Sequence, residues 1–223
     1  IKQNNCEIDN NKESLLPDIQ FTGRNLKIDN RKIDSVSFKV IDSTEKLKIE
    51  NINGSFGAGA GTLTANYQFD KKTSKSSFKT QLISQNVAAV TEFIKLQKGF
   101  TGNSGHVDIQ LTWLGGLDCF STEKTEGNIR FTLKEGSIED VEPGLARLIG
   151  LLSIESLVRR LQLDLKDVTN KGMVYDEIKG KADLKKGVVI IEDFKIKAPS
   201  AIGEIKGKAN ISNQTFDLVA NIT

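Results

Sequence analysis

Apolar and polar residues alternate along most of this chain. In residues 107–113 the apolar side chains occupy every second position, at Val107, Ile109, Leu111 and Trp113. The positions between them hold Asp108, Gln110 and Thr112. Because successive side chains of a strand point to opposite faces of a sheet, this period of two predicts a strand with one apolar and one polar face.

The same alternation recurs in seven other segments. Their apolar positions are Val36, Phe38 and Val40; Leu47 and Ile49; Leu63, Ala65, Tyr67 and Phe69; Ile129, Phe131 and Leu133; Val188 and Ile190; Ile205, Gly207, Ala209 and Ile211; and Phe216, Leu218, Ala220 and Ile222. Polar or glycine-containing turns separate these segments. The pattern predicts a mainly β fold, a meandering antiparallel sheet with one apolar face and one face in water.

Two segments depart from the alternation. Residues 87–97 have apolar residues at helical spacing before Gly99, which predicts a short helix. Residues 143–161 carry two apolar stripes that would lie on nearly opposite sides of one straight helix. A break at Leu152–Ser153, with Ser153 as the cap of a second helix, would place both stripes on one core. We therefore predict two or three short helices beside the sheet.

Charge and length narrow the class of protein. The 223 residues include 31 basic and 29 acidic side chains, for a net charge of +2. A nucleic-acid-binding surface needs a clustered excess of Lys and Arg, so we expect no nucleic-acid partner. The longest apolar stretch, residues 145–154, contains Arg147 and is shorter than the roughly 20 residues of a membrane-spanning helix. The chain begins at Ile1 without a leader, and we interpret it as part of a longer protein.

Catalytic motifs are absent from the sequence. His106 is the single histidine, falls on the polar face of its strand and has no accompanying nucleophile motif, so we interpret it as a surface residue. Cys6 and Cys119 lack the spacing of zinc ligands and are interpreted as separate thiols, with a single disulfide bridge as the alternative. We predict that the protein is not an enzyme and that it holds no metal and no cofactor.

Two short motifs could hold a phosphate group. A dinucleotide fingerprint in residues 57–61 would require a glycine at Thr62 and a following helix, whereas the next residues alternate as a strand. We therefore expect a bulge or a close backbone approach at a sheet edge. Arg159 and Arg160 could bind a lipid phosphate, but salt bridges to nearby acids and closure of a helix end are the favoured interpretation.

Several segments resemble a known family. They are residues 142–164 (EPGLARLIGLLSIESLVRRLQLD), residues 172–180 (GMVYDEIKG), the strand that contains Leu111-Thr112-Trp113, and residues 198–201 followed by Ile205-Lys206-Gly207. In this order they are similar to the C-terminal signature of the YhdP branch of the AsmA-like proteins. The resemblance covers residues 53–223, and residues 1–52 are less diagnostic. It implies a single elongated domain over residues 1–223.

The resemblance also implies a function and a location. The sheet would curl into an apolar groove, in the periplasmic part of a protein that is anchored in the inner membrane of a Gram-negative-type bacterium. Such a protein conducts phospholipids between the inner and outer membranes and supports the outer-membrane barrier. Its partners would be phospholipid and an outer-membrane or envelope protein. The candidate lipid-binding residues are Val107, Ile109, Leu111, Trp113, Ile129, Phe131, Leu133, Leu148 and Leu152.

Physical reasoning is compatible with this function and leaves alternatives open. Exposing two 16-carbon chains to water costs on the order of 20 kcal/mol, at about 0.8 kcal/mol per CH₂ group. A continuous apolar trough would lower that cost without any chemical step. Alternating strands also build a closed sandwich with a filled core. A scaffold that docks a partner through a strand edge is a second hypothesis, and an envelope hydrolase that uses carboxylates is the least favoured.

Overall fold

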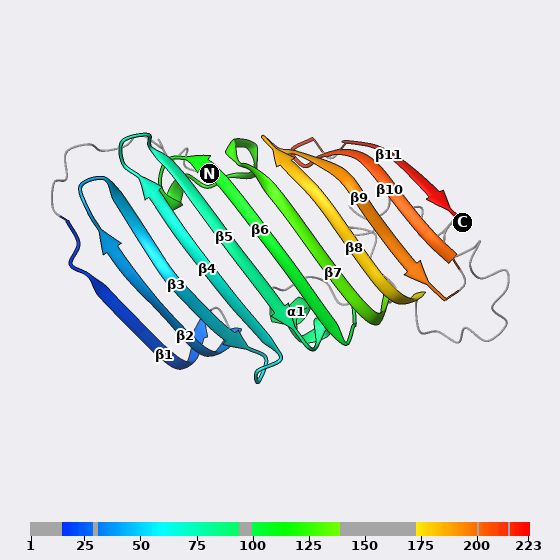
Figure 1. Cartoon of the computed structure of the whole chain (residues 1–223), viewed down its shortest axis with the longest axis horizontal. Coiled ribbons are helices and arrows are strands. Elements are labelled where there is room, and N and C mark those ends of the chain that lie inside the picture. Colours follow the sequence, from blue (N-terminus) through cyan, green and yellow to red (C-terminus); the bar gives the residue numbers. More distant parts are fainter. Residues whose placement is uncertain (1–14, 29–30, 94–99, 139–172, 200, 214) are drawn as a thin grey trace.

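Eleven strands lie side by side in one sheet, in the same order as in the sequence (Figure 1). The computed structural model describes residues 15–28, 31–93, 100–138, 173–199, 201–213 and 215–223. The strands are β1 (Ile19–Ile28), β2 (Arg31–Asp42), β3 (Lys46–Phe56), β4 (Gly61–Asp70), β5 (Lys75–Ser84), β6 (Ser104–Leu114), β7 (Glu126–Ile138), β8 (Met173–Lys185), β9 (Val188–Ala198), β10 (Ala201–Asn210) and β11 (Thr215–Ile222). Each pairs antiparallel with the next, which confirms the predicted meander.

Short turns connect most of the strands, as the sequence predicts. Between β8 and β9, Lys186 and Gly187 both have positive φ, at 50° and 82°. A two-residue hairpin with this backbone matches the right-handed twist of the flanking strands and favours glycine. Between β4 and β5, the Asp70 side chain accepts a hydrogen bond from the Thr73 backbone nitrogen at 2.8 Å, which fixes that turn locally.

Register shifts alter which residues face the apolar side. The pairing of β8 with β9 shifts between Lys181 and Ala182, so that Val189 lies opposite Leu184 and Ile191 lies opposite Ala182. Val188 and Ile190, which we expected on the apolar face, therefore lie on the polar face. This part of the prediction is wrong because a bulge reverses the alternation within one strand.

The described part of the chain contains one α-helix. Helix α1 (Val87–Phe93) occupies the start of the helix predicted at residues 87–97, and residues 94–99 lie outside the described residues. Asn86 caps it, because its Oδ1 accepts a hydrogen bond from the Ala89 backbone nitrogen at 3.2 Å. Two 3₁₀ turns, η1 (Leu117–Cys119) and η2 (Thr122–Lys124), lie between β6 and β7. The break predicted at Leu152–Ser153 also lies outside the described residues.

Buried apolar side chains gather in two clusters. One contains Ile138, Tyr175, Ile178 and Ile196, with Phe100, Phe131, Leu133 and Phe194 packed against it. The other contains Tyr67, Trp113 and Cys119, with Ile49, Phe69, Phe78 and Leu111 packed against it. In the described residues a single layer of strands carries both clusters. None of the helices in this part of the chain is long and apolar enough to cross a membrane.

Candidate functional site: the apolar face of the sheet

Strand register brings one residue from each strand into a row that crosses the whole sheet. The members of this central row are Phe21, Phe38, Ile52, Ala65, Thr80, Ile109, Ile129, Ala182, Ile191, Gly207 and Leu218. Neighbours in the row are direct register partners except Phe38 and Ile52, where the pairing of β2 with β3 is irregular. Thr80 is the one hydroxyl-bearing member. The row is therefore apolar over nearly its whole length.

Two further rows flank the central row on the same face. The first contains Gly23, Val36, Gly54, Leu63, Leu82, Val107, Phe131, Gly180, Phe194, Ile205 and Ala220. The second contains Ile19, Val40, Ile49, Tyr67, Phe78, Leu111, Gly127, Leu184, Val189, Ala209 and Phe216. Both rows are unbroken in register from β1 to β11. We call the three rows together the apolar band.

The dimensions of the apolar band follow from sheet geometry. Eleven strands make ten spacings of about 4.8 Å, so the band is about 48 Å long across the strands. Rows on one face are two residues apart, at about 3.4 Å per residue, so the outer two rows are about 14 Å apart. The band is therefore a long strip that runs perpendicular to the strands.

The candidate residues of β6 and β7 share this face. Val107, Ile109, Leu111, Ile129, Phe131 and Leu133 are half-buried in the structure. Trp113 differs, because only 5% of its surface is exposed and it belongs to one of the buried clusters. Leu148 and Leu152 lie outside the described residues. The structure therefore brings together seven of the nine predicted residues, six of them partly accessible.

Helix α1 covers the apolar face at one end of the strands. The Phe93 ring stacks on the Phe56 ring with centroids 4.2 Å apart, and Val87 and Val90 are buried beneath the helix. Gly105 has no side chain where the helix packs on the sheet. A Cβ atom at this position would lie 3.2 Å from the Val87 side chain, so the glycine makes room for the helix. Gly61 likewise has no side chain, and this leaves room for the Phe56 ring on which Phe93 stacks. Packing therefore covers this end of the apolar face near β3, β4 and β6.

At the opposite end of the strands, the β6–β7 connection covers the part of the face formed by β4, β5 and β6. Trp113 stacks on Tyr67 and meets the Phe120 ring edge-on, with ring centroids 6.0 Å and 5.2 Å away. The Trp113 indole nitrogen donates a hydrogen bond to the Gly116 carbonyl oxygen at 2.7 Å. Ser76 donates to the Gly115 carbonyl oxygen at 2.6 Å, so the connection is fixed to the sheet. Burial raises the pKa of the Tyr67 hydroxyl above its ordinary value.

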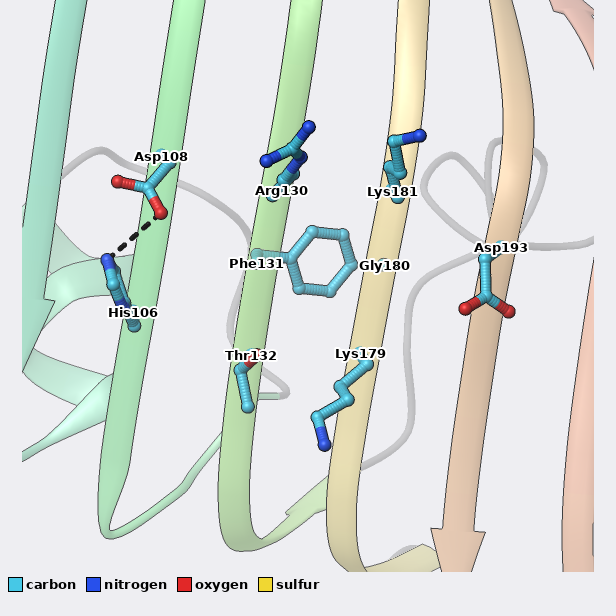
Figure 2. A pocket seen from close by; sticks show the side chains of 9 residues that line it. All are labelled: His106, Asp108, Arg130, Phe131, Thr132, Lys179, Gly180, Lys181 and Asp193. Carbon is cyan, nitrogen blue, oxygen red and sulfur yellow. Dashed lines mark ion pairs between the residues drawn. The ribbon is translucent and has the colours of Figure 1, made fainter.

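The reverse face of the sheet is polar and charged. It carries a shallow hollow of about 180 Å³. Figure 2 shows the side chains that line this hollow, among them His106, Asp108, Arg130 and Asp193. The His106 Nε2 lies 3.1 Å from the Asp108 Oδ2, and both side chains are nearly half exposed. His106 is thus on the polar face, as predicted. Among the described residues there is no group of three or more His, Cys, Asp or Glu side chains that could hold a metal ion.

The glycine-rich segment forms the β3–β4 turn. Gly57, Ala58 and Gly59 have φ values of 65°, 57° and 82°, a conformation that favours glycine. The Asp34 carboxylate accepts a hydrogen bond from the Gly59 nitrogen at 3.0 Å, and strand β4 follows directly. The expected bulge or close backbone approach at a sheet edge is not found here: β4 is an interior strand of the described sheet, and what comes close to Gly61 is the Phe56 ring. No helix follows the glycines, in contrast to a dinucleotide-binding loop.

Several residues of the apolar band were not among the predicted site residues. Phe21, Phe38, Ile52, Ile191 and Leu218 occupy the same central row as Ile109 and Ile129. Phe38 and Leu218 belong to alternating segments, so the signal that selected β6 and β7 was present in some of the other strands too. The alternation identifies the face, but only the register shows that the rows are continuous.

Comparison with known proteins decides the family. A family model described as YhdP protein matches residues 2–223. The chain belongs to the YhdP family. The match includes the first fifty residues, in which the sequence offered few recognisable motifs.

Among curated proteins, this YhdP family chain is similar to the intermembrane phospholipid transporter YhdP of Escherichia coli (strain K12). The two are 28% identical over 171 residues, which is 75% of the chain and 14% of the relative. The chain therefore spans a small part of the length of that protein. No solved structure matches the chain.

Proposed function

We propose that this chain conducts phospholipids between the inner and outer membranes by holding their acyl chains against the apolar band. The observation that carries the proposal is the run of three apolar rows across all eleven strands, most of whose positions remain partly accessible. Membership of the YhdP family supports it, as does the similarity to a protein named as an intermembrane phospholipid transporter.

The energetics favour a continuous strip over separate patches. Each CH₂ group in water costs about 0.8 kcal/mol, so any gap in apolar contact along the path raises the barrier to movement. The central row offers an apolar or glycine residue on ten of its eleven strands. A lipid could therefore move along the band while it exchanges one apolar neighbour for the next.

The distribution of burial favours an open trough over a filled core. The fully buried side chains of the two clusters lie toward opposite ends of the strands, as with Ile178 at 1% exposed and Trp113 at 5%. Between these ends, Ile109 and Ile129 are only half-buried. A closed sandwich would bury the middle of the face most deeply, whereas in the central row only Ala65, at 3% exposed, is buried.

The proposal places the chain in the periplasm, as part of a longer protein anchored in the inner membrane. Phospholipid exchanged between two membranes must cross the aqueous space between them, and the polar reverse face suits contact with water. Residues such as Asp108, Gln110 and Arg130 line that face. The head group would remain at the edge of the band, in contact with water.

Site-specific photo-crosslinking in cells tests the proposal. We expect a photoreactive residue at Ile109 or Phe131 in the full-length protein to capture phospholipid. The same residue at Asp108 or Gln110, on the opposite face, is the matched control and should capture none. Equal capture on both faces, or capture on neither, would contradict the proposal. Native mass spectrometry of the purified chain should also detect bound phospholipid.

A second candidate function is a scaffold that docks an envelope protein at a strand edge. Strand β11, at one edge of the described sheet, has the sequence TFDLVANI and carries no Lys or Pro, the residues that commonly protect edges from pairing. Val219 on this strand is 63% exposed. Such an edge can accept another strand through main-chain hydrogen bonds.

The edge hypothesis has a separate test. The register points the Ala220 N–H away from β10, so Ala220→Pro would remove one outward backbone donor and disrupt strand addition, whereas Val219→Lys would protect the edge by charge. We expect both variants to lose a crosslinked protein partner under this hypothesis while phospholipid capture at Ile109 persists. If both variants retain the partner, docking does not use β11.

A further inference from the structure

Gly180 lies between two phenylalanine residues on the apolar face. Its register partners are Phe131 on β7 and Phe194 on β9, so the three residues are consecutive in one row of the apolar band. The two rings meet edge-to-face with centroids 6.0 Å apart. Figure 2 shows the Phe131 ring reaching from β7 toward Gly180 on β8.

The Phe131 ring occupies the space of a missing side chain. A Cβ atom at Gly180 would lie 2.2 Å from Phe131 Cε1 and 2.4 Å from Cζ, far inside van der Waals contact. Gly180 is itself buried, whereas Phe131 is half-buried. The ring therefore covers the backbone of β8 with one surface, while part of its own surface stays accessible.

Another glycine in the same row lacks this arrangement. A Cβ atom at Gly54 would meet nothing closer than the Ser35 carbonyl oxygen at 3.9 Å and Leu63 at 4.0 Å. Gly54 could thus accept a methyl group without moving a neighbour. The contrast shows that the close fit at Gly180 is a property of its position and not of every glycine in the band.

From this geometry we propose that Gly180 is a positioning residue for lipid movement. Because Gly180 has no side chain, the Phe131 ring can lie close to the backbone of β8. The position of this ring sets the depth of the trough over β7, β8 and β9. This inference rests on the proposed function. Val107, the partner of Phe131 on β6, and Phe194 occupy the two lateral directions. A ring displaced from Gly180 would therefore have to rise into the path of the lipid.

The variant Gly180→Ala tests the inference in the full-length protein in cells. Photoreactive residues at Ile109 on β6 and at Leu218 on β11 report phospholipid on the two sides of Gly180. We expect Gly180→Ala to change the ratio of capture at these two positions several-fold, because lipid would reach one side and not the other. Gly54→Ala, the matched control in the same row, should leave the ratio unchanged.

A second-site change separates obstruction from a general loss of structure. The double variant Gly180→Ala with Phe131→Ala keeps the added methyl group but removes the ring, and it should restore the wild-type ratio. The Gly180→Ala protein could fail to accumulate in cells. The double variant still tests the inference in that case, because its accumulation with a wild-type capture ratio would identify the Phe131 ring as the obstacle.

Two outcomes would overturn the role assigned to Gly180. One is a wild-type ratio in the single variant, and the other is a double variant that fails to restore the ratio. Absence of phospholipid capture at Ile109 and Leu218 in the wild-type protein would instead overturn the proposed function. The two failures are therefore distinguishable in one set of measurements.

Discussion

At the scale of single residues, the apolar face offers two different environments for a charge. Ile178 is 1% exposed within a buried cluster, whereas Ile109 is half-buried in the central row. We predict that Ile178→Asp lowers the free energy of unfolding by about 3–5 kcal/mol, as an unpaired buried charge does. Ile109→Asp should cost about 1 kcal/mol, because water can reach the carboxylate. Urea unfolding of the purified chain measures both.

The comparison between these two variants also tests the trough itself. Ile109→Asp should abolish phospholipid capture at the neighbouring Phe131 while the protein remains folded. Equal and large losses of stability in the two variants would show instead that the centre of the face is a filled core.

A second residue-scale prediction concerns acid stability. The Asp42 side chain is only 8% exposed and its Oδ1 lies 2.6 Å from the Lys71 ammonium group. Burial by itself raises the pKa of this carboxyl, but hydrogen bonds from Lys71 and from the Leu16 backbone outweigh burial, and the pKa is lowered. The folded state therefore gains stability above the unfolded pKa and loses it as the pH falls through the lowered folded pKa.

The test of this ion pair is an Asp42→Asn variant. We expect the substitution to remove about 1 kcal/mol of stability at neutral pH and to flatten the loss of stability below about pH 4. Asp18→Asn serves as the control, because Asp18 is 60% exposed and 3.4 Å from Lys39. Parallel acid-unfolding curves for the wild type and Asp42→Asn would contradict the expectation.

At the scale of elements, helix α1 depends on a few contacts with the sheet. The stack of Phe93 on Phe56 joins the end of the helix to the end of β3. We predict that Phe93→Ala costs about 2 kcal/mol, less than a fully buried phenylalanine would, because Phe93 is half-buried. Hydrogen exchange should accelerate in residues 87–93 but not in β8 or β9. Glu92→Ala, at an exposed position of the same helix, should change neither.

The elements also show how far the sequence alone could lead. Period-two alternation located the strands and assigned Val107, Ile109 and Ile129 to one face, because side-chain direction in a strand is a local property. The same pattern misplaced Val188 and Ile190, since a bulge between β8 and β9 depends on pairing with a neighbour. The role of Gly180 was equally out of reach, because it depends on a ring that lies 49 residues earlier in the chain, at Phe131.

At the scale of the whole molecule, contacts between elements follow the order of the chain. Each strand pairs with the strands before and after it in the sequence. We predict that deletion of residues 201–223, which removes β10 and β11, leaves β1–β6 with wild-type hydrogen-exchange protection, because no register partner of those strands is lost. Loss of protection throughout the sheet would show that the molecule unfolds as one cooperative unit.

Because the strands follow one another in sequence order, the length of the sheet is proportional to the number of strands. One added hairpin returns the chain to the same end of the strands and lengthens the sheet by two strand spacings, about 10 Å. It also leaves every existing residue on its original face. A single added strand would instead leave the chain at the opposite end of the strands. Every later connection would then lie at the other end of the sheet. The length of such a sheet can therefore change in steps of one hairpin, and the number of hairpins alone sets that length.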